Sequence, residues 1–496
     1  MKFEELKEKI KEKELKVDMD LITLAYEYAR DAHGEQLRKS GELYINHPLA
    51  TAYKLADMGM DETTIIAGLL HDVPEDTNKT IYDIKKEFGV EVAQIISGIT
   101  KLGQIKYRGM ERYIENLRRM FIAMAEDIRV IIIKFADRIH NLETLSVLPP
   151  HKQKRVALES LEIYAPIANR LGMGEIKGVL EDLSFPYIYP DEYEWIENNF
   201  AIQRRQKKKI IDKYIKELEV VLQNEDIPYL SMHGRAKHIY SLYKKLLRHD
   251  RDISKIYDLV AVRIIVSEIS QCYECLGIIH QHSKPLKGRI KDYIAQPKPN
   301  GYQSLHTTIF SPYGEIIEIQ IRTQEMHLEA EYGIAAHWAY KENFNPKKIQ
   351  KKLTWINELS QIVKTSFKED GQQKLESLKL DVFQDRIFVF TPKGDVIELP
   401  ENATPIDFAY HIHTDLGHYC SSVRVNDEIA TLDTKLRSGD VVSITIDPRK
   451  KGPSIDWLKF AKTTKARKHI KTFLRNKKRG FIQKFFTRHS ALEQDF

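Results

Sequence analysis

Four polar residues that can bind metal or move protons lie close together in the sequence LLHDVPEDTN. His71 and Asp72 end an apolar run, and Glu75 and Asp76 follow directly after Pro74. Because proline disfavours helical geometry at the residue before it, we predict that His71 and Asp72 lie in the last turn of a helix. Glu75 and Asp76 are then expected to begin the loop beyond that helix.

Two further segments carry matching residue types, with His47 in INHP and Asp137 in KFADRIHNLETL. Asp137, Asn141 and Thr144 are spaced i, i+4 and i+7, so they share one polar face of a predicted helix. Two imidazoles and two carboxylates, without a thiolate, suit Mn²⁺, Fe or Mg²⁺ better than a structural zinc. Such a metal lowers the pKa of a bound water. Glu75 and Asp76 are near enough to position or deprotonate this water.

A single His-Asp pair at a helix end is more commonly a cap with a satisfied histidine. Two histidines and two aspartates spread over an all-helical segment are much more specific, and they favour a metal site over a cap. His33 and His140 fall outside this pattern and are predicted to be ordinary polar positions.

A second group of polar residues, from 235 to 341, is typical of a nucleotide site. The strand pattern IIEIQIR has period two, which places Glu318, Gln320 and Arg322 on one face and the isoleucines on the core face. Asp258 opens a neighbouring predicted strand and would hold Mg²⁺ between phosphates together with Glu318. The cations that match the charge of a triphosphate are Arg235, Lys237, Arg289, Lys291 and Lys298.

The loop PKPNGYQS is rigid around Pro297 and Pro299, and it presents Tyr302 as a platform for a base. Neither a Walker loop nor GxGxxG is present, so side chains must hold the phosphates. For any single lysine, a solvated surface position is the more common alternative. The polar and charged residues that follow one another in 288–307 nevertheless favour a nucleotide site. The isolated CxxC at 272–275 is interpreted as chance proximity of two thiols rather than a zinc site.

The periodicity of apolar residues predicts which elements position these groups. Residues 1–185 show helical spacing throughout, and strand patterns begin only with 258–266 and with the turn-linked pair in 306–322. We expect an all-α domain at 1–185, an α/β domain at 186–345, and a polar helical linker at 346–380.

Residues 381–446 are predicted to form a small α+β, ubiquitin-like unit. RIFVFT, the turn PKGD and VIEL make a hairpin. Thr404 fits a helix N-cap, Pro405 the first helical position and Asp407 the acidic third position, with Gly417 as the expected helix stop. Two more strands follow.

Composition sets limits on the class of protein. A chain of 496 residues with 42% hydrophobic and 30% charged residues predicts about three soluble domains. No run of the sequence approaches the about 18 apolar residues of a membrane-spanning helix, so we expect no membrane span. The amino terminus is highly charged, so we expect no signal peptide. Three cysteines indicate a reducing cytosol. Residues 447–496 hold 15 Lys/Arg against 4 Asp/Glu, so the first 446 residues carry −5 of the total +6. This basic end predicts a polyanionic partner.

Together these segments resemble a long RelA/SpoT-type enzyme, the bifunctional synthetase/hydrolase of the alarmones (p)ppGpp. HDVPEDT and FADRIHNL are similar to its HD-type hydrolase half, and RIKDYI, KPNGYQSLHTT and EIQIRT to its nucleotidyltransferase-like synthetase half. Residues 381–446 resemble its β-grasp TGS domain, and GPSIDWLKFAKTTKARKHIK the start of its helical domain at 447–496. Long members continue into zinc-finger-like and ACT domains, so a chain that stops at Phe496 is expected to be a truncated piece or a naturally short protein.

The resemblance implies that one half hydrolyses (p)ppGpp. Mn²⁺ would be bound by the predicted metal ligands His47, His71, Asp72 and Asp137. Glu75 and Asp76 would activate the water that removes the 3′-pyrophosphate. The residues matching family positions that hold the nucleotide are Arg38, Lys39, Ser40, Asn141 and Thr144.

The other half would transfer pyrophosphate from ATP to the 3′-hydroxyl of GTP or GDP. Asp258 and Glu318 would bind Mg²⁺, with Glu318 near the attacking hydroxyl, and Tyr302 would stack on guanine. Synthetase-only relatives have an acidic run where this chain has Arg289-Ile-Lys291-Asp292, so the basic form favours bifunctionality. The implied ATP ligands are Arg235, Lys237, Arg263, Arg289 and Lys291, and the implied acceptor-nucleotide ligands are Lys298, Asn300, Tyr302, His306 and Gln320.

The carboxy-terminal part is expected to bind uncharged tRNA and the ribosome. His413 matches the family position that recognises the tRNA acceptor end, whereas His411 and His418 could simply cap and pack the helix. The tail alternates cations with phenylalanines, which suits RNA, although a shortened helical domain would also expose such residues. A different hypothesis is a catalytically inactive tRNA- or ribosome-binding regulator, against which the two intact ligand sets argue.

Overall fold

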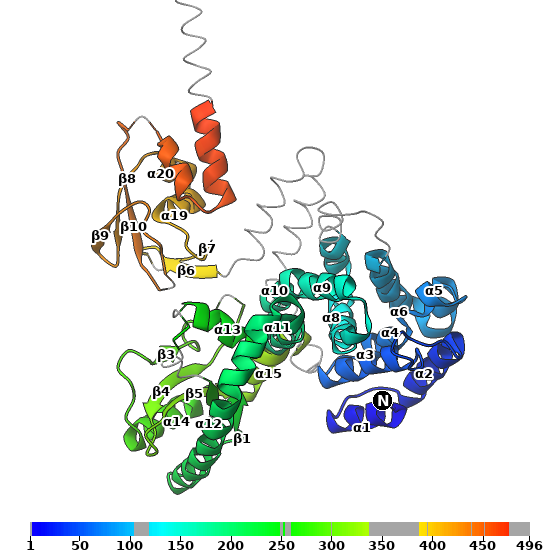
Figure 1. Cartoon of the computed structure of the whole chain (residues 1–496). Helices are drawn as coiled ribbons and strands as arrows, with labels where there is room; N and C mark the ends of the chain where they lie inside the picture. Colours follow the sequence, from blue (N-terminus) through cyan, green and yellow to red (C-terminus); the bar gives the residue numbers. More distant parts are fainter. Residues whose placement is uncertain are drawn as a thin grey trace, which may run out of the picture. The chain divides into compact units, whose positions relative to one another are not determined.

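The computed structural model divides into two compact units, Met1–Phe367 and Lys368–Phe496, and each is described here by itself (Figure 1). Asp258, Pro299 and the predicted linker 346–380 lie outside the described residues. The described residues are 2–103, 119–248, 251–252, 259–298, 300–336, 386–393, 395–437, 439–450 and 452–475.

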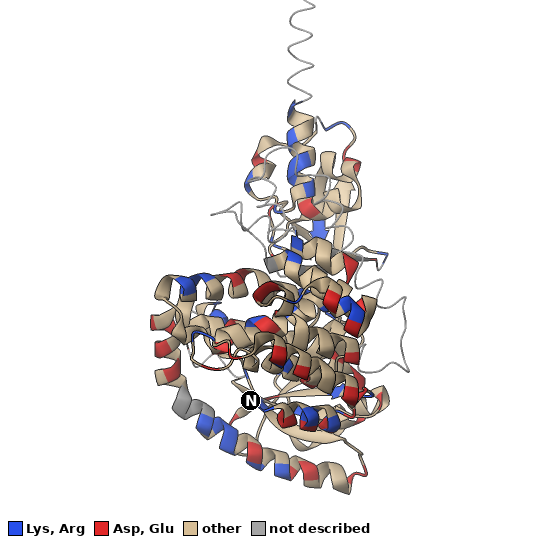
Figure 2. Cartoon of the chain, turned by 90° about the vertical axis from the view of Figure 1, so that its right-hand side faces the viewer, with Lys and Arg blue, Asp and Glu red and all other residues tan. Residues whose placement is uncertain are grey.

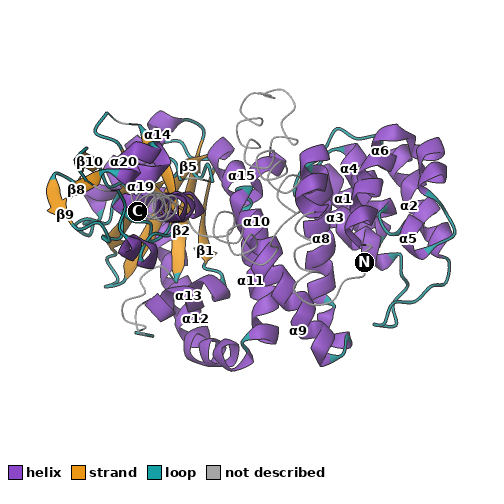
Figure 3. Ribbon diagram, turned by 90° about the horizontal axis from the view of Figure 1, so that it is seen from above, coloured by secondary structure: helices purple, strands orange, loops and turns teal. Residues whose placement is uncertain are grey.

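The amino-terminal part of the first unit is helical, as the periodicity predicts, and the described residues up to 188 contain no strand (Figure 3). Its centre is α4, whose residues 64–70 are all buried. A helix that is apolar on every side must lie inside a bundle, and α4 packs against α2, α3 and α6. The helices are α1 (Phe3–Glu12), α2 (Met19–His33), α3 (Asn46–Asp57), α4 (Glu62–Leu70), α5 (Val73–Asp76), α6 (Ile81–Gly103), α8 (Arg129–Glu143), α9 (Pro150–Glu159), α10 (Ala165–Arg170) and α11 (Gly174–Ile188).

Helix α11 packs on both parts of the first unit. It contacts α8 and α9 on one side, and on the other α12 (Pro190–Asn224), α13 (Ile239–Arg248) and α15 (Gln324–Tyr332). The backbone at Gly333 approaches the backbone at Leu171 closely, and a Cβ on Gly333 would lie 2.2 Å from the carbonyl oxygen of Leu171. Glycine is therefore required at this position. The predicted boundary at 185 falls inside α11, and the domain limits remain predictions.

The α/β part of the first unit contains a five-stranded sheet in the order β1-β2-β5-β4-β3. Strands β2 and β5 are parallel, and the other neighbours are antiparallel. The strands predicted within 258–266 and 306–322 are confirmed. The strands are β1 (Ser231–Ala236), β2 (Val260–Val266), β3 (Lys291–Asp292), β4 (Leu305–Phe310) and β5 (Ile316–Thr323), with α14 (Ile269–His282) between β2 and β3.

The two faces of this sheet differ in character, as the period of two in IIEIQIR predicts. On one face, alternate residues such as Val262 and Ile319 form a core with residues of α12 and α14. On the other face, strand register aligns one polar residue from each strand in a single row. In order across the sheet, this row is His233, Arg263, Gln320, His306 and Lys291.

The second unit has the hairpin and helix predicted for it. Thr404 and Asp407 form the capping box of α19, with Pro405 in the first turn. The expected stop at Gly417 is wrong, because Gly417 lies inside α20 and a Cβ there would meet the Tyr410 ring at 2.3 Å. The elements are β6 (Arg386–Phe390), β7 (Val396–Pro400), α19 (Pro405–Ile412), α20 (Thr414–His418), β8 (Cys420–Val425), β9 (Glu428–Ala430) and β10 (Val442–Ile446).

The predicted boundary at 446 does not separate two cores. Trp457, Ala461 and Ile470 pack with Ile406 and Tyr410 of α19. The fully buried Asp407 carboxylate accepts hydrogen bonds from the backbone NH groups of residues 404, 462 and 463, at 2.7–3.1 Å. Residues 452–475 are thus part of the same folded unit.

Charged residues of both signs lie along the helices of the chain (Figure 2). The helical residues 464–475 carry five cations and no acidic residue. Within the described ranges, no helix combines the length and the apolar character needed to cross a membrane.

We predict that Asp407→Ala destabilises the second unit, because it leaves several buried NH groups without an acceptor. The free energy of unfolding should fall by about 3 kcal/mol. Urea denaturation followed at Trp457 would measure this change. Asp433→Ala, at an exposed carboxylate of the same unit, is the control and should have little effect. Equal stability of both variants would contradict the role given to Asp407.

Candidate functional site

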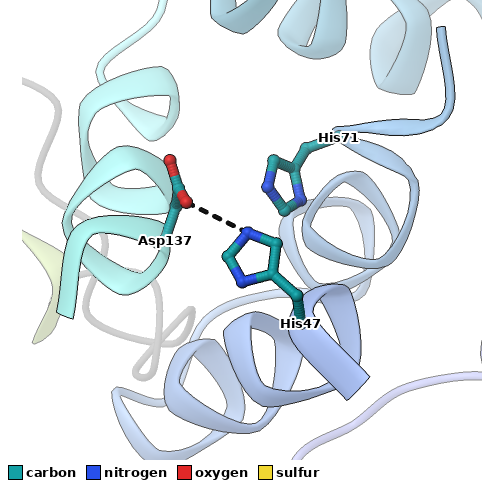
Figure 4. Close-up of side chains that lie close together, drawn as sticks. All are labelled: His47, His71 and Asp137. Carbon is teal, nitrogen blue, oxygen red and sulfur yellow. Dashed lines mark ion pairs between the residues drawn. The ribbon is translucent and has the colours of Figure 1, made fainter. Parts of the chain in front are cut away.

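Three residues that could hold a metal ion meet where α3, α4 and α8 converge (Figure 4). They are His47 in α3, His71 directly after α4 and Asp137 in α8, all buried, with ligand atoms within 4.8 Å of one another. His47 Nε2 lies 3.1 Å from Asp137 Oδ1. The structure therefore brings together three of the four predicted metal ligands in one group.

Asp72, the fourth predicted ligand, lies beside this group. Its carboxylate oxygens are 3.2 Å from His71 Nε2 and 3.4 Å from His47 Nε2. The expectation that Glu75 and Asp76 begin a loop is wrong, because Val73–Asp76 form the single-turn helix α5. Proline is tolerated in the first turn of a helix, so Pro74 ends α4 and starts α5 within a few residues.

The hydrogen bonding of His71 fits a metal ligand. Its Nδ1 donates to the Gly68 carbonyl oxygen at 2.8 Å, so Nε2 carries the lone pair. Among the described residues this buried Nε2 has no hydrogen-bond donor, and it faces the Asp72 carboxylate, which also can only accept. A cation between the two acceptors would satisfy both, and a second hydrogen bond of this kind commonly orients ligating histidines.

Asp137 has the charge state that a hard metal ion requires. Burial opposes its ionisation, but the Lys134 ammonium outweighs burial and holds the Asp137 pKa well below its usual value. Lys134 Nζ and Asn141 Nδ2 each donate to its oxygens at 2.6 Å. Burial also lowers the pKa of His47, which favours the neutral imidazole that binds metals.

His140 is more than the ordinary polar position expected for it. Its Nδ1 lies 2.8 Å from His47 Nδ1 and 3.2 Å from Arg38 Nη1. Burial, His47 and the Arg38 charge lower the pKa of His140 to about 3. The i, i+3 spacing from Asp137 could have placed it on the same helical face. His33 instead stacks on Tyr44 and contacts Gln36.

A cavity of about 410 Å³ opens next to these groups. All five predicted nucleotide-binding residues line it, together with the polar residues Tyr44, Lys134, Asp137 and Arg138. Its apolar wall suits a base, while the cations suit phosphates. The predicted residues lining it are Arg38, Lys39, Ser40, Asn141 and Thr144, and the apolar wall is Leu37, Leu145, Val147, Leu148 and Val156.

Tyr44 is a site residue that the sequence patterns missed. Its hydroxyl lies 3.0 Å from Asp72 Oδ2 and 2.5 Å from Asp76 Oδ2, so it connects a metal ligand with an acidic residue of α5.

The Glu75 side chain reaches the surface, but protein atoms near its carboxyl group displace water and raise its pKa, with a contribution from the Asp72 charge. A raised pKa makes Glu75 a better proton acceptor.

The polar face of the sheet concentrates positive charge. Arg235, Arg263 and Arg322 all approach the carboxylate of Glu331, at 3.4, 3.0 and 3.4 Å. Arg235 also pairs with Glu175 of α11 at 2.9 Å. Burial and the neighbouring Arg322 lower the pKa of Arg263 to about 9. Three guanidinium groups against two carboxylates leave a net positive charge, which makes this face a site for an anion.

Beside this cluster, the predicted acceptor-site residues form a hydrogen-bonded chain. The Tyr302 hydroxyl lies 2.7 Å from His306 Nε2, and His306 Nδ1 lies 3.1 Å from Glu318 Oε1. Gln320 Nε2 donates to Glu318 at 3.0 Å. The Lys298 ammonium lies over the Tyr302 ring, 4.9 Å from its centroid. Asn300 Oδ1 accepts a hydrogen bond from the Tyr302 backbone NH at 3.2 Å.

The remaining predicted residues are less tightly enclosed. Arg289 and Lys291 are exposed, and Lys237 is half-buried just beyond β1. His413 is exposed at the start of α20, where its Nδ1 accepts from the Asp415 NH. The two thiols at 272 and 275 lie in the sheet core, and burial raises the pKa of each to about 12.

Comparison with known protein families finds three domain matches. Residues 25–174 match the HD domain, residues 234–345 match a region found in RelA / SpoT proteins, and residues 387–446 match the TGS domain. The multidomain fold class predicted from sequence is thereby confirmed. The HD match implies a divalent metal ion, for which His47, His71 and Asp137 provide a ligand group.

Curated relatives match most of the chain. A guanosine-3′,5′-bis(diphosphate) 3′-pyrophosphohydrolase of Aquifex aeolicus is 47% identical over 92% of the chain. The bifunctional (p)ppGpp synthase/hydrolase SpoT of Escherichia coli is 46% identical over 92%, and a GTP pyrophosphokinase of Myxococcus xanthus 46% over 93%. The chain spans 65%, 65% and 61% of these relatives' own lengths, respectively. With three domain matches in this order and such identity along its length, the chain belongs to the RelA/SpoT family.

Proposed function

We propose that the chain is a bifunctional alarmone enzyme that makes and hydrolyses (p)ppGpp. The observation that carries this proposal is the acceptor-facing His71 Nε2 in a buried His/Asp group, directly beside a cavity lined by cations and apolar residues. The polar face of the sheet supplies a second, separate anion site. Relatives named as pyrophosphohydrolase, pyrophosphokinase and bifunctional enzyme support both activities.

For hydrolysis, we infer that His47, His71, Asp72 and Asp137 hold Mn²⁺, since a set of two imidazoles and two carboxylates suits that ion. When bound, the ion supplies a water of lowered pKa and neutralises charge on the pyrophosphate. Glu75 would accept a proton from this water, and the Tyr44 hydroxyl, which contacts both carboxylates, holds Asp76 beside Asp72.

The cavity would orient (p)ppGpp for this reaction. Arg38 and Lys39 line the cavity and would pair with phosphates or stack on the base, and the apolar wall, which includes Leu145 and Leu148, would cover the purine. Arg38 now donates to Asn141 Oδ1 at 2.7 Å, so the group that grips the nucleotide is oriented before binding. Such preorganisation reduces the entropy lost on binding.

For synthesis, Arg235 and Arg263 would neutralise the triphosphate of ATP, together with Lys237, Arg289 and Lys291. Glu318 accepts a hydrogen bond from the side chain of Gln320 and contacts His306, which would place it to accept the proton of the attacking 3′-hydroxyl. Mg²⁺ would be held by Glu318 and Asp258. Pyrophosphoryl transfer of this kind depends chiefly on positioning and charge neutralisation.

The second unit would provide contacts to uncharged tRNA and the ribosome in the cytoplasm. His413 is exposed, and the helical residues 464–475 present five cations with no acidic residue between them. Cations of this density favour a phosphate backbone as partner.

Substitution of Asp72 should separate the two activities. We expect Asp72→Asn to lower hydrolysis at least about 100-fold, because it removes one anionic ligand, while synthesis stays within about twofold. Glu318→Gln is the matched variant in the other site and should have the opposite effect. Nucleotide chromatography with ATP and GTP plus Mg²⁺, and separately with ppGpp plus Mn²⁺, measures both. Wild-type protein inactive in both assays would favour a regulator without catalysis.

Tyr302 should determine affinity for the acceptor nucleotide. Loss of base stacking in Tyr302→Ala should raise the KM for GTP or GDP about 10-fold and the KM for ATP much less. Tyr302→Phe keeps the ring and removes only the hydrogen bond to His306, so it should bind guanine nucleotides nearly normally. Equal losses for both substrates in the alanine variant would remove Tyr302 from the acceptor site.

The basic tail should contribute to the salt dependence of RNA binding. Deleting residues 447–496 would also remove the core residues Trp457 and Ile470, so the useful truncation is 476–496, which contains five cations. We expect it to reduce the slope of log affinity against log salt for tRNA by roughly 0.7–0.9 for each phosphate that the shortened protein no longer neutralises. Filter binding over a range of salt measures the slope, and an unchanged slope would exclude these cations from the interface.

A further inference from the structure

His140 belongs to no part of the mechanism given above, yet it lies between the metal ligands and the nucleotide cavity. It follows Asp137 by three residues on α8, and its ring centroid is 5.0 Å from that of His47. Its Nδ1 is within hydrogen-bond distance of groups on two other segments, His47 of α3 and Arg38 of the loop before α3.

The identity of the partners determines which atoms carry hydrogens. A guanidinium group has donors and no acceptor, so Arg38 Nη1, at 3.2 Å, must donate to His140 Nδ1. His140 Nδ1 therefore carries no hydrogen. His47 Nδ1 lies 2.8 Å from this acceptor and must itself be the N–H donor.

This hydrogen bond sets the tautomer of His47. With the hydrogen on Nδ1, the lone pair of the neutral ring is on Nε2, and Nε2 is the atom that faces Asp137 and Asp72. His71 shows the same arrangement, with a backbone carbonyl oxygen in the place that His140 takes beside His47. Both histidines of the group thus have an acceptor that holds Nδ1–H and directs Nε2 toward the carboxylates.

A second path of hydrogen bonds leaves the same guanidinium group. Arg38 Nη2 donates to Asn141 Oδ1 at 2.7 Å, and Asn141 Nδ2 donates to Asp137 Oδ1 at 2.6 Å. Arg38 is thus connected to His47 through His140 and to Asp137 through Asn141. His140 Nδ1 thus contacts the Arg38 guanidinium group as well as the His47 ring, and the two contacts fix the position of the His140 side chain.

We propose that His140 is a positioning residue that holds His47 in the Nδ1–H tautomer, so that His47 Nε2 is available as a metal ligand. This inference rests on the proposed hydrolase function. It predicts that an acceptor at the His140 Nδ1 position, rather than an imidazole as such, is what the metal site requires.

Two substitutions separate an acceptor from a merely space-filling side chain. His140→Asn places a carbonyl oxygen near the position of Nδ1, whereas His140→Leu fills similar space without an acceptor. Titration calorimetry of the full chain with MnCl₂, without nucleotide, measures metal affinity directly. We expect His140→Leu to weaken Mn²⁺ binding about 10- to 100-fold, as for other supporting hydrogen bonds to metal ligands, and His140→Asn to stay within about threefold of wild type.

Hydrolysis of ppGpp provides the second measurement. The leucine variant should regain most of its kcat when Mn²⁺ is raised to saturate the weakened site, and the asparagine variant should need no extra metal. Synthesis by the same preparations, together with the thermal unfolding midpoint, reports whether each variant is folded.

The outcomes distinguish a failure of the metal centre from a failure of the role given to His140. Absence of Mn²⁺ binding by wild-type protein, or binding unchanged in His71→Ala, would overturn the metal centre and with it the proposed hydrolase. Metal binding that is lost in His71→Ala but equal in the leucine and asparagine variants, whether both are weak or both normal, would overturn the role of His140 alone.

Discussion

The ionised carboxylate of Asp137, buried inside a helical bundle, is the constraint on which the first half of the structure depends. A buried charge costs several kcal/mol unless partners compensate it. Lys134 and Asn141 supply donors to this carboxylate from its own helix, whereas His47 of α3 turns its Nε2 toward it. The packing of α3, α4 and α8 at this point brings His47 and His71 to the same carboxylate, so the three ligand groups meet inside the bundle.

On the polar face of the sheet the buried charges are mainly positive. Its strand register puts every second residue on one face, so a single alternation of isoleucine with polar residues in β5 builds both the core and the site. The core face binds α12 and α14, and this leaves the opposite face for cations. Glu331 of α15 alone approaches three guanidinium groups there, which allows Arg263 and Arg322 to be almost completely buried.

Patterns that act within one segment could be predicted from the sequence. The alternation in β5, the capping box of Thr404 and the shared helical face of Asp137, Asn141 and Thr144 each depend on neighbours a few positions away. Features that depend on packing between segments could not. The hydroxyl of Tyr44 reaches α5, and Gly417 is needed because the Tyr410 ring lies against it. Both arrangements exist only after the chain has folded, so spacing alone carries no sign of them.

The metal group of the helical part and the polar face of the sheet differ in the charge that a ligand must bring. Around the metal group, buried acceptors face one another and require a cation, which explains why no donor in the described part of the chain reaches His71 Nε2. On the sheet, buried guanidinium nitrogens of Arg263 and Arg322 have no acceptor among the residues that the structure describes, and the three guanidinium groups outnumber the Glu331 and Glu175 carboxylates that pair with them. Under the proposed function, a triphosphate supplies the missing acceptors. Each half of the chain thus holds polar atoms that its own protein groups leave unsatisfied, and the sign of that deficit decides whether metal or phosphate binds there.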